Sequence, residues 1–174
     1  MKTLFQIRPL ETTDSIGELT SLLHRAYARL GQMGLNYTAV DQTPEVTSSR
    51  IRGGHCFVVT AAHKLVGTIV VQPTYRQSAC EYFMRLGVAA AHQFAVDPDY
   101  QGSGIGRMLL QRAEQWATAA GFAELAIDTA EPAKHLSWAL YPPRLPSSWP
   151  CPVARQGVSK CCSQQVPRGK CVTV

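Results

Sequence analysis

The chain has 174 residues, of which 45% are apolar, and these values suit one globular domain with a buried core. Its net charge of +5 comes entirely from the part after residue 136, because residues 1–136 contain 12 basic and 12 acidic residues. The basic balance is therefore weak support for nucleic-acid binding. No apolar run approaches the ~18 residues of a transmembrane helix and no signal-peptide core is present, so we expect a cytoplasmic protein. The six cysteines include no C-x-x-C pair, so we expect no metal site.

Short strands and helices are predicted to fill the first half of the chain. Hydroxyl and carboxylate side chains cap helix N-termini, proline is favoured at the first helical position, and strands form short apolar or alternating runs. In chain order these patterns predict a strand over residues 5–8, a helix from an N-cap at Thr12, Thr13 or Asp14 to about residue 30, a helix from Thr43-Pro44 to about residue 52, and a hairpin of strands 56–60 and 65–71 that turns near His63 and Lys64.

The second half begins with residues 75–87, which have no clear pattern. The later patterns predict a strand over residues 88–96, a helix over 107–120, a strand over 125–129 and a helix that begins at residue 131. No repeat or linker divides residues 1–136, so we expect one α/β domain there, followed by an atypical tail over residues 137–174.

A glycine-rich turn joins the strand over residues 88–96 to the helix that follows. Pro98 ends the strand, and Gly102, Gly104 and Gly106 allow the backbone to approach a ligand closely. The turn places free N–H groups and the positive end of a helix dipole where a phosphate could bind. A Walker P-loop is excluded because Arg-Met, not Lys-Ser/Thr, follows the last glycine, and the glycine spacing differs from that of a dinucleotide fingerprint.

The same stretch resembles the acetyl-CoA pyrophosphate loop of the GNAT acyltransferase superfamily. The matching features are the Val-x-Pro break at Val96, Gln101, the spaced glycines Gly104 and Gly106, and the amphipathic helix after them. The resemblance covers about residues 5–136. It implies an α/β fold of the GNAT acyl-CoA N-acyltransferase type, in which helices flank a mixed central sheet. It also implies acetyl-CoA as co-substrate.

The resemblance indicates which residues would contact acetyl-CoA. In the family, pantetheine binds along the strand before the loop and the pyrophosphate binds in the loop. Carried over to this sequence, the strand contacts fall on the backbone of Phe94, Ala95 and Val96. The pyrophosphate would be held by Gln101, Gly102, Ser103, Gly104, Ile105 and Gly106, with Arg107 as an additional charge.

The catalytic candidates are one histidine and one tyrosine. Amine acetylation needs a neutral nitrogen and a proton for the leaving thiolate. The family places its base, when it has one, on the strand before the loop, where period-2 spacing puts His92 on the same face as Phe94 and Val96. The alternative is a half-buried histidine that only satisfies its own hydrogen bonds. Tyr141 corresponds to the family's acid on the last helix, although two prolines follow it and would end that helix.

For the acceptor, the resemblance points to Tyr37, with Asp41 and Gln42 beside it, and to Asp128. Asp128 could instead cap the next helix, and the loop residues could simply be solvated. The expected function is transfer of acetyl from acetyl-CoA to a primary amine of a small molecule or protein. The alternative function is that of a non-catalytic or inactive CoA-binding remnant that has lost its acceptor half. Neither a membrane nor a nucleic acid is an expected partner, and the oligomeric state stays open, with a homodimer among the options.

The tail over residues 137–174 departs from the family pattern. No acid follows Glu131, proline and cysteine accumulate, and no alternation predicts strands that would complete the sheet. Reading possible codons of Ser137 to Pro146 from the second base permits LGLYTRRGYR, which contains the tyrosine and Gly-Tyr pattern that the last helix should carry. The same shift over Ser159 to Gln165 permits ANVVLSK, a plausible closing strand. Our hypothesis is that the tail is a frameshifted GNAT C-terminus.

Overall fold

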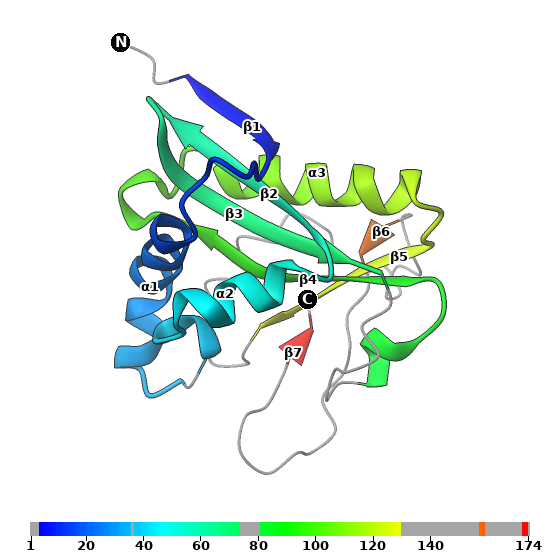
Figure 1. Cartoon of the computed structure of the whole chain (residues 1–174). Helices are drawn as coiled ribbons and strands as arrows, with labels where there is room; N and C mark the ends of the chain where they lie inside the picture. The colour runs from blue at the N-terminus through cyan, green and yellow to red at the C-terminus, as the bar shows by residue number, and fades with distance from the viewer. Residues whose placement is uncertain (1–3, 36, 74–80, 130–156, 159–171, 174) are drawn as a thin grey trace, which may run out of the picture. The chain divides into compact units, whose positions relative to one another are not determined.

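A computed structural model describes residues 4–35, 37–73, 81–129, 157–158 and 172–173 (Figure 1). It divides into two compact units, Met1–Gln72 with Ala91–Ala113 and Pro73–Ala90 with Glu114–Val174. The elements in chain order are β1 (Phe5–Pro9), α1 (Ile16–Gln32), η1 (Thr38–Val40), α2 (Pro44–Ile51), β2 (His55–Ala61), β3 (Lys64–Gln72), η2 (Glu81–Met84), β4 (Val88–Val96), η3 (Pro98–Tyr100), α3 (Ile105–Ala119), β5 (Glu124–Thr129), β6 (Gly157–Val158) and β7 (Val172–Thr173). None of the described helices combines the length and apolarity that a bilayer crossing needs.

In the first unit the strands lie in the order β1-β2-β3-β4. β1 pairs antiparallel with β2, and β2 pairs antiparallel with β3. The predicted hairpin is confirmed, and its two-residue turn is Ala62-His63, with φ of 47° and 70°. Positive φ at both central residues matches the right-handed twist of the flanking strands, which explains how such a short connection closes the hairpin.

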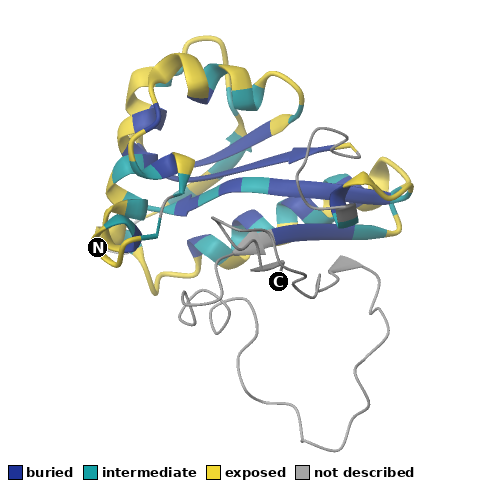
Figure 2. Ribbon diagram, turned by 90° about the horizontal axis from the view of Figure 1, so that it is seen from below, coloured by how far each residue is buried: buried dark blue, intermediate teal, exposed yellow. Residues whose placement is uncertain are grey.

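Helices cover both faces of these strands. On one face, Leu19 and Leu22 of α1 pack in a buried cluster with Cys56 and Val58 of β2. Phe57 points to the other face, since successive strand residues alternate, and the guanidinium of Arg112 in α3 lies 4.9 Å from its ring centroid. Figure 1 shows α1 and α2 on one side of the strands and α3 on the other. Figure 2 shows the strands buried and the outer helix surfaces exposed.

β3 and α3 are in close contact at Gly67. A Cβ atom added there would lie 2.7 Å from Ile105 Cγ2 and 3.1 Å from Leu109 Cδ1. Real Cβ atoms do not sit at the shorter of these distances, because interiors are packed to the density of organic crystals. Glycine at this position is therefore what allows α3 to lie directly against the sheet.

The helix starts were predicted in part. α2 begins as expected, because the Thr43 side chain accepts from the Val46 N–H and Pro44 opens the helix. For α1 the prediction of Thr12, Thr13 or Asp14 as cap is wrong, because Ser15 accepts from the Glu18 N–H at 3.2 Å. Two Arg8 nitrogens donate to the Asp14 carboxylate at 2.7 and 2.8 Å, and this pairing keeps Asp14 out of the cap.

The second unit contains β5 with two short strands from the tail. β5 pairs in parallel with β6 through Glu124 and Leu125, and antiparallel with β7 through Asp128 and Thr129. The expectation that the tail supplies no strand is therefore wrong. Pairing of two residues uses only backbone N–H and C=O groups and needs no side-chain alternation. The helix predicted from residue 131 lies outside the described residues.

Candidate functional site

The candidate site lies in the first unit, where β4 runs through a short turn into α3. The predicted contact residues, Phe94 to Val96 and Gln101 to Arg107, lie on this continuous segment, and residues 101–104 are exposed. Gly102 and Gly104 adopt φ of 76° and 89°, a left-handed region that costs other residues energy. The Gly104 carbonyl accepts the first helical bond of α3, from the Met108 N–H at 3.1 Å. The N–H groups of the first turn then have no intrahelical acceptor and point out of the helix end.

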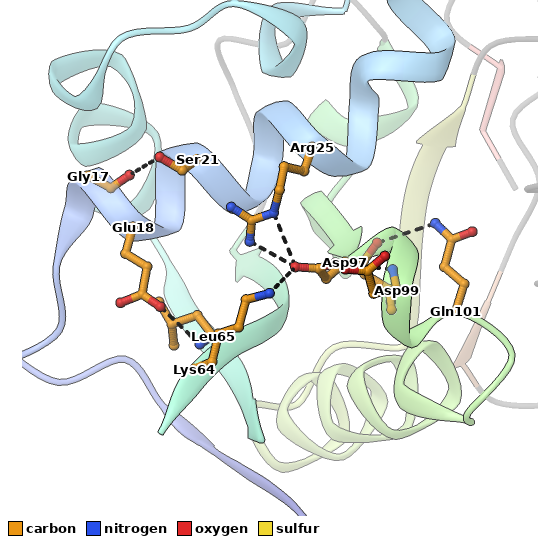
Figure 3. Close-up of polar contacts among 10 residues, drawn as sticks. Gly17, Glu18, Ser21, Arg25, Lys64, Leu65, Asp97, Asp99 and Gln101 are labelled. Atoms are coloured by element: carbon orange, nitrogen blue, oxygen red, sulfur yellow. Dashed lines mark hydrogen bonds and ion pairs between the residues drawn. The ribbon is translucent and has the colours of Figure 1, made fainter. Parts of the chain in front are cut away.

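Side-chain hydrogen bonds join the turn to the end of β4, and β4 to α1. Gln101 Nε2 donates to the Val96 carbonyl at 3.3 Å, and Ser103 Oγ donates to the Tyr100 carbonyl. The Phe94 carbonyl accepts from Tyr27 Oη at 3.0 Å. A carbonyl has two lone pairs, so these strand carbonyls keep the capacity for a second donor. Figure 3 shows Gln101 reaching back from the turn toward the strand.

A buried carboxylate anchors the exit of β4. Asp97 is 1% exposed, and its Oδ2 lies 2.8 Å from Arg25 Nη2 of α1 and 3.2 Å from Lys64 Nζ of β3 (Figure 3). Its Oδ1 accepts from the Asp99 N–H at 3.2 Å. Burial acts to raise the pKa of Asp97, but the two cations and the backbone donor outweigh it and hold the pKa below its usual value. We call Arg25, Lys64 and Asp97 the charged exit.

His92 lies within β4 and contacts the end of β3. Gln72 Nε2 is 2.9 Å from His92 Nε2, and because an amide nitrogen only donates, this histidine nitrogen accepts. The neutral ring therefore carries its proton on Nδ1. Burial, with the charge of Arg50 as a smaller cause, lowers the pKa of His92 to about 3. The imidazole is neutral at pH 7, and its Nε2 lone pair is already engaged.

A neutral hydrogen-bonded cluster joins the α1–α2 connection to β4. Gln42 Nε2 donates to Thr47 Oγ1 at 2.6 Å and to Gln93 Oε1 at 3.2 Å. Thr20 Oγ1 lies 2.8 Å from Thr47 Oγ1, and the His24 ring contacts the Gln42 carbonyl at 2.8 Å. We call Thr20, Gln42, Thr47 and Gln93 the amide network. Gln93 has a φ of 49°, a strained backbone conformation of the kind that concentrates at functional sites.

The other predicted site residues, Tyr37, Asp128 and Tyr141, lie in different parts of the chain. Tyr37 is half-buried, and its ring centroid lies 5.4 Å from that of Tyr27 in an edge-on arrangement. Asp128 lies on β5 in the second unit, paired with Thr173. Tyr141 lies outside the described residues. The structure thus brings His92 and the loop segment together on β4 and α3, and it places Tyr37 in the same unit.

Several residues of this region were not predicted as site residues. They are Arg25, Arg50, Lys64, Gln72, Gln93 and Asp97. One sequence signal was available: Gln93 is a polar residue within the mostly apolar strand β4, and buried polar groups require partners. The partners of Asp97 carry no such signal, because Arg25 and Lys64 lie far from it in the sequence. Within the described ranges no group of three or more metal-ligating side chains is found.

Comparison with known proteins identifies the family. Residues 19–144 match the sequence model of the acetyltransferase (GNAT) family. The chain belongs to this family, and it has the α/β fold of the GNAT acyltransferases with a mixed sheet flanked by helices.

Three relatives illustrate the likeness. Over 98 residues the chain is 30% identical to the S-(2-succino)cysteine N-acetyltransferase of Bacillus subtilis, a match that covers 56% of this chain and 57% of the relative. The ribosomal-protein-S18-alanine N-acetyltransferase of Escherichia coli superposes with a TM-score of 0.57 at 24% identity over 79% of this chain and 75% of that one. A GNAT acetyltransferase of Elizabethkingia anophelis with acetyl-CoA bound superposes with a TM-score of 0.55 at 18% identity, over 78% and 72%.

Proposed function

We propose that this protein transfers the acetyl group of acetyl-CoA to a primary amine of a small molecule or protein. The observation that carries the proposal is the turn between β4 and α3, where left-handed Gly102 and Gly104 precede the open N-terminus of a helix. Backbone N–H groups and the helix dipole in this arrangement favour a pyrophosphate. The acetyl-CoA bound to the structural relative from Elizabethkingia anophelis supports the same cofactor.

In the proposed complex the loop holds the pyrophosphate and β4 holds the pantetheine arm. The N–H groups of residues 102–106 donate to phosphate oxygens, and the exposed side chain of Arg107 adds a positive charge. Phe94, Ala95 and Val96 contribute backbone contacts to the amides of pantetheine. The loop is exposed to solvent at residues 101–104, so the pyrophosphate can reach it without opening of the fold.

The proposed reaction is direct transfer in a ternary complex. The amine nitrogen attacks the thioester carbonyl, the C–N bond forms, the C–S bond breaks, the nitrogen loses one proton and the sulfur of CoA gains one. The chemistry of Cys56 supports a route without an acyl-enzyme: burial raises the pKa of this thiol to about 11, and Cys56 Sγ is 3.5 Å from Thr68 Oγ1. A thiol held protonated in this way is a poor nucleophile.

His92 is the proposed base, with a restriction from its surroundings. A pKa of about 3 makes it a weak base, and Gln72 occupies its Nε2. We propose that it receives the proton only from an amine that arrives neutral, after Gln72 has turned away. Tyr141 is the proposed acid toward the thiolate, and Tyr37 and Asp128 are proposed to contact the acceptor. A cytoplasmic location and a homodimer complete the proposal.

The domain boundary is proposed at residue 136, with residues 137–174 as a frameshifted ending. The abrupt loss of acids after Glu131 supports this hypothesis. Sequencing the gene tests it, since the nucleotides after the codon of Leu136 should encode a GNAT ending in another frame. A gene whose other frames encode no such ending would contradict the hypothesis.

The activity is tested with the full chain in two parallel measurements. Release of CoA from acetyl-CoA is followed with a panel of primary amines, and thermal unfolding is followed with and without acetyl-CoA. We expect turnover with at least one amine and a higher melting temperature with acetyl-CoA, because a ligand that binds only the folded state stabilises it. Stabilisation without turnover would favour the non-catalytic CoA-binding remnant, and the absence of both would contradict the proposal.

A further inference from the structure

The amide network contains two buried atoms that nothing in the described part of the chain satisfies. They are Gln42 Oε1, an acceptor, and Gln93 Nε2, a donor. Both residues are 4% exposed. A buried polar group without a partner costs about 1–3 kcal/mol. A molecule that offers one donor and one acceptor at these two atoms would therefore gain binding energy from groups that the fold already holds in place.

The rest of the network fixes the orientation of these atoms. Both hydrogens of Gln42 Nε2 are used, one toward Thr47 and one toward Gln93. Turning over the Gln42 amide alone would place its oxygen against Gln93 Oε1, where neither atom can donate, and would lose that bond. His24 also holds the Gln42 backbone carbonyl at 2.8 Å. The open acceptor and the open donor are thus preorganised, which reduces the entropy that a ligand loses on binding.

A cationic side chain lies on the same helix as Thr47 of the amide network. Arg50 follows Thr47 by three positions on α2, so the two side chains project from adjacent positions of the helix. Arg50 is half-buried and forms no hydrogen bond or ion pair with any residue that the structure describes. Its charge acts on His92, the neighbour of Gln93 in β4. A planar guanidinium in this situation is suited to bind a carboxylate with two parallel hydrogen bonds.

We propose that the acceptor is an amine with a carboxylate on the adjacent carbon, that is, an α-amino acid or a close analogue. The carboxylate binds Arg50 and accepts from Gln93 Nε2, and the amine nitrogen donates to Gln42 Oε1. The chemistry of the three groups is complementary, because a carboxylate only accepts and an amine N–H donates. An amine without a carboxylate would leave Arg50 and Gln93 unpaired. This inference rests on the proposed acetyl transfer and specifies its substrate class.

The experiment compares acceptors that differ only in the carboxylate. CoA release is measured with L-amino acids, with their amides and with the decarboxylated amines, such as phenylalanine, phenylalaninamide and phenethylamine. We expect kcat/KM to be about 100-fold higher for the acids, the ratio expected when one charge-assisted contact of about 3 kcal/mol is lost. Arg50→Gln should raise the KM for the acids at least about 10-fold and leave the KM for acetyl-CoA unchanged, with partial rescue by Arg50→Lys.

Arg52→Gln is the matched control, because Arg52 is an exposed arginine just beyond α2, and it should change neither constant. Equal kcat/KM for acids and amines, or an equal effect of both arginine variants, would overturn the inference while leaving acetyl transfer intact. Calorimetry of the same L-amino acids with the CoA-saturated protein reads the acceptor site without turnover. Binding that Arg50→Gln abolishes would support the inference even if no CoA is released, and absence of binding by every acid would overturn it.

Discussion

β4 is held at two places by different kinds of interaction, ion pairs at one and neutral hydrogen bonds at the other. At its exit, Asp97 has a full set of partners, which are two cations and a backbone N–H. Further back along the same strand, Gln93 belongs to a neutral network that leaves one donor and one acceptor open. Because both carboxylate oxygens of Asp97 already have partners within the protein, we interpret the charged exit as a structural contact that fixes the strand to α1 and the hairpin. The amide network is incomplete, and it is this incompleteness that indicates ligand binding.

The largest expected effect concerns the loop that the charged exit supports. Gly104→Val forces a β-branched residue into a φ of 89° and should lower CoA affinity by about 100-fold, roughly 3 kcal/mol, because the loop must rearrange to relieve the strain. Calorimetry with CoA measures it. Gly34→Val is the control, since Gly34 has a φ of 75° with no atom within 4 Å of its Cβ position and lies outside the loop. Unchanged CoA affinity in the Gly104 variant would remove the cofactor site from this turn.

The next effect tests the charged exit itself. Asp97→Asn should reduce the free energy of unfolding by about 2 kcal/mol at pH 7, because charge-assisted hydrogen bonds to a buried group are lost. The pKa of Asp97 is lowered in the folded state from 3.8, so its contribution is present above about pH 4 and is lost as the pH falls through the folded value. Urea unfolding at pH 7 and pH 3 measures both. A variant as stable as the parent at pH 7 would show that these ion pairs add no net stability to the fold.

The third effect is spread over a range of pH and concerns the neutral imidazole of His92. The folded pKa of His92 is about 3, against 6.5 for a free histidine. Between these values the unfolded chain binds the proton and the folded one does not, so stability falls as the pH falls, by about 1.4 kcal/mol per pH unit.

Asp14 and Asp97 titrate below the window from pH 6.5 to 4.5. Burial raises the pKa of Glu114, which changes stability in the opposite sense but equally in parent and variant, so the difference between the two isolates the His92 contribution. His92→Gln should remove the slope, whereas His63→Asn, at an exposed turn position with a φ of 70°, should retain it. The same pH dependence in the parent and in His92→Gln would mean that the imidazole is charged in the fold.

Elements with strong local signals could be predicted from the sequence. The hairpin, the start of α2 at Thr43 and the glycine turn before α3 agree with the structure. The cap of α1 could not be predicted, because three neighbouring side chains could all serve and the choice depends on the pairing of Asp14 with Arg8. The short strands of the tail carry only two residues each, too few for a side-chain pattern.

The site was predictable where a motif of consecutive residues carries it. The segment from Phe94 to Arg107 is such a motif, and the family match confirms the family that it indicated. The charged exit and the amide network depend on residues that are distant in sequence, such as Arg25 and Asp97, or Gln42 and Gln93. Nothing in the local pattern reports that two distant side chains meet, so this part required the structure.

Gly67 has a consequence for how this protein tolerates change. The missing side chain at this position sets the distance between β3 and the first turns of α3, since a Cβ there would collide with Ile105 and crowd Leu109. Ile105 is also the first residue of the helix that begins at the glycine turn. A substitution at residue 67 therefore moves the loop by moving its helix, although residue 67 itself lies inside the sheet and belongs to no motif. In an alignment of working relatives, such a spacer would vary only together with smaller residues at positions 105 and 109.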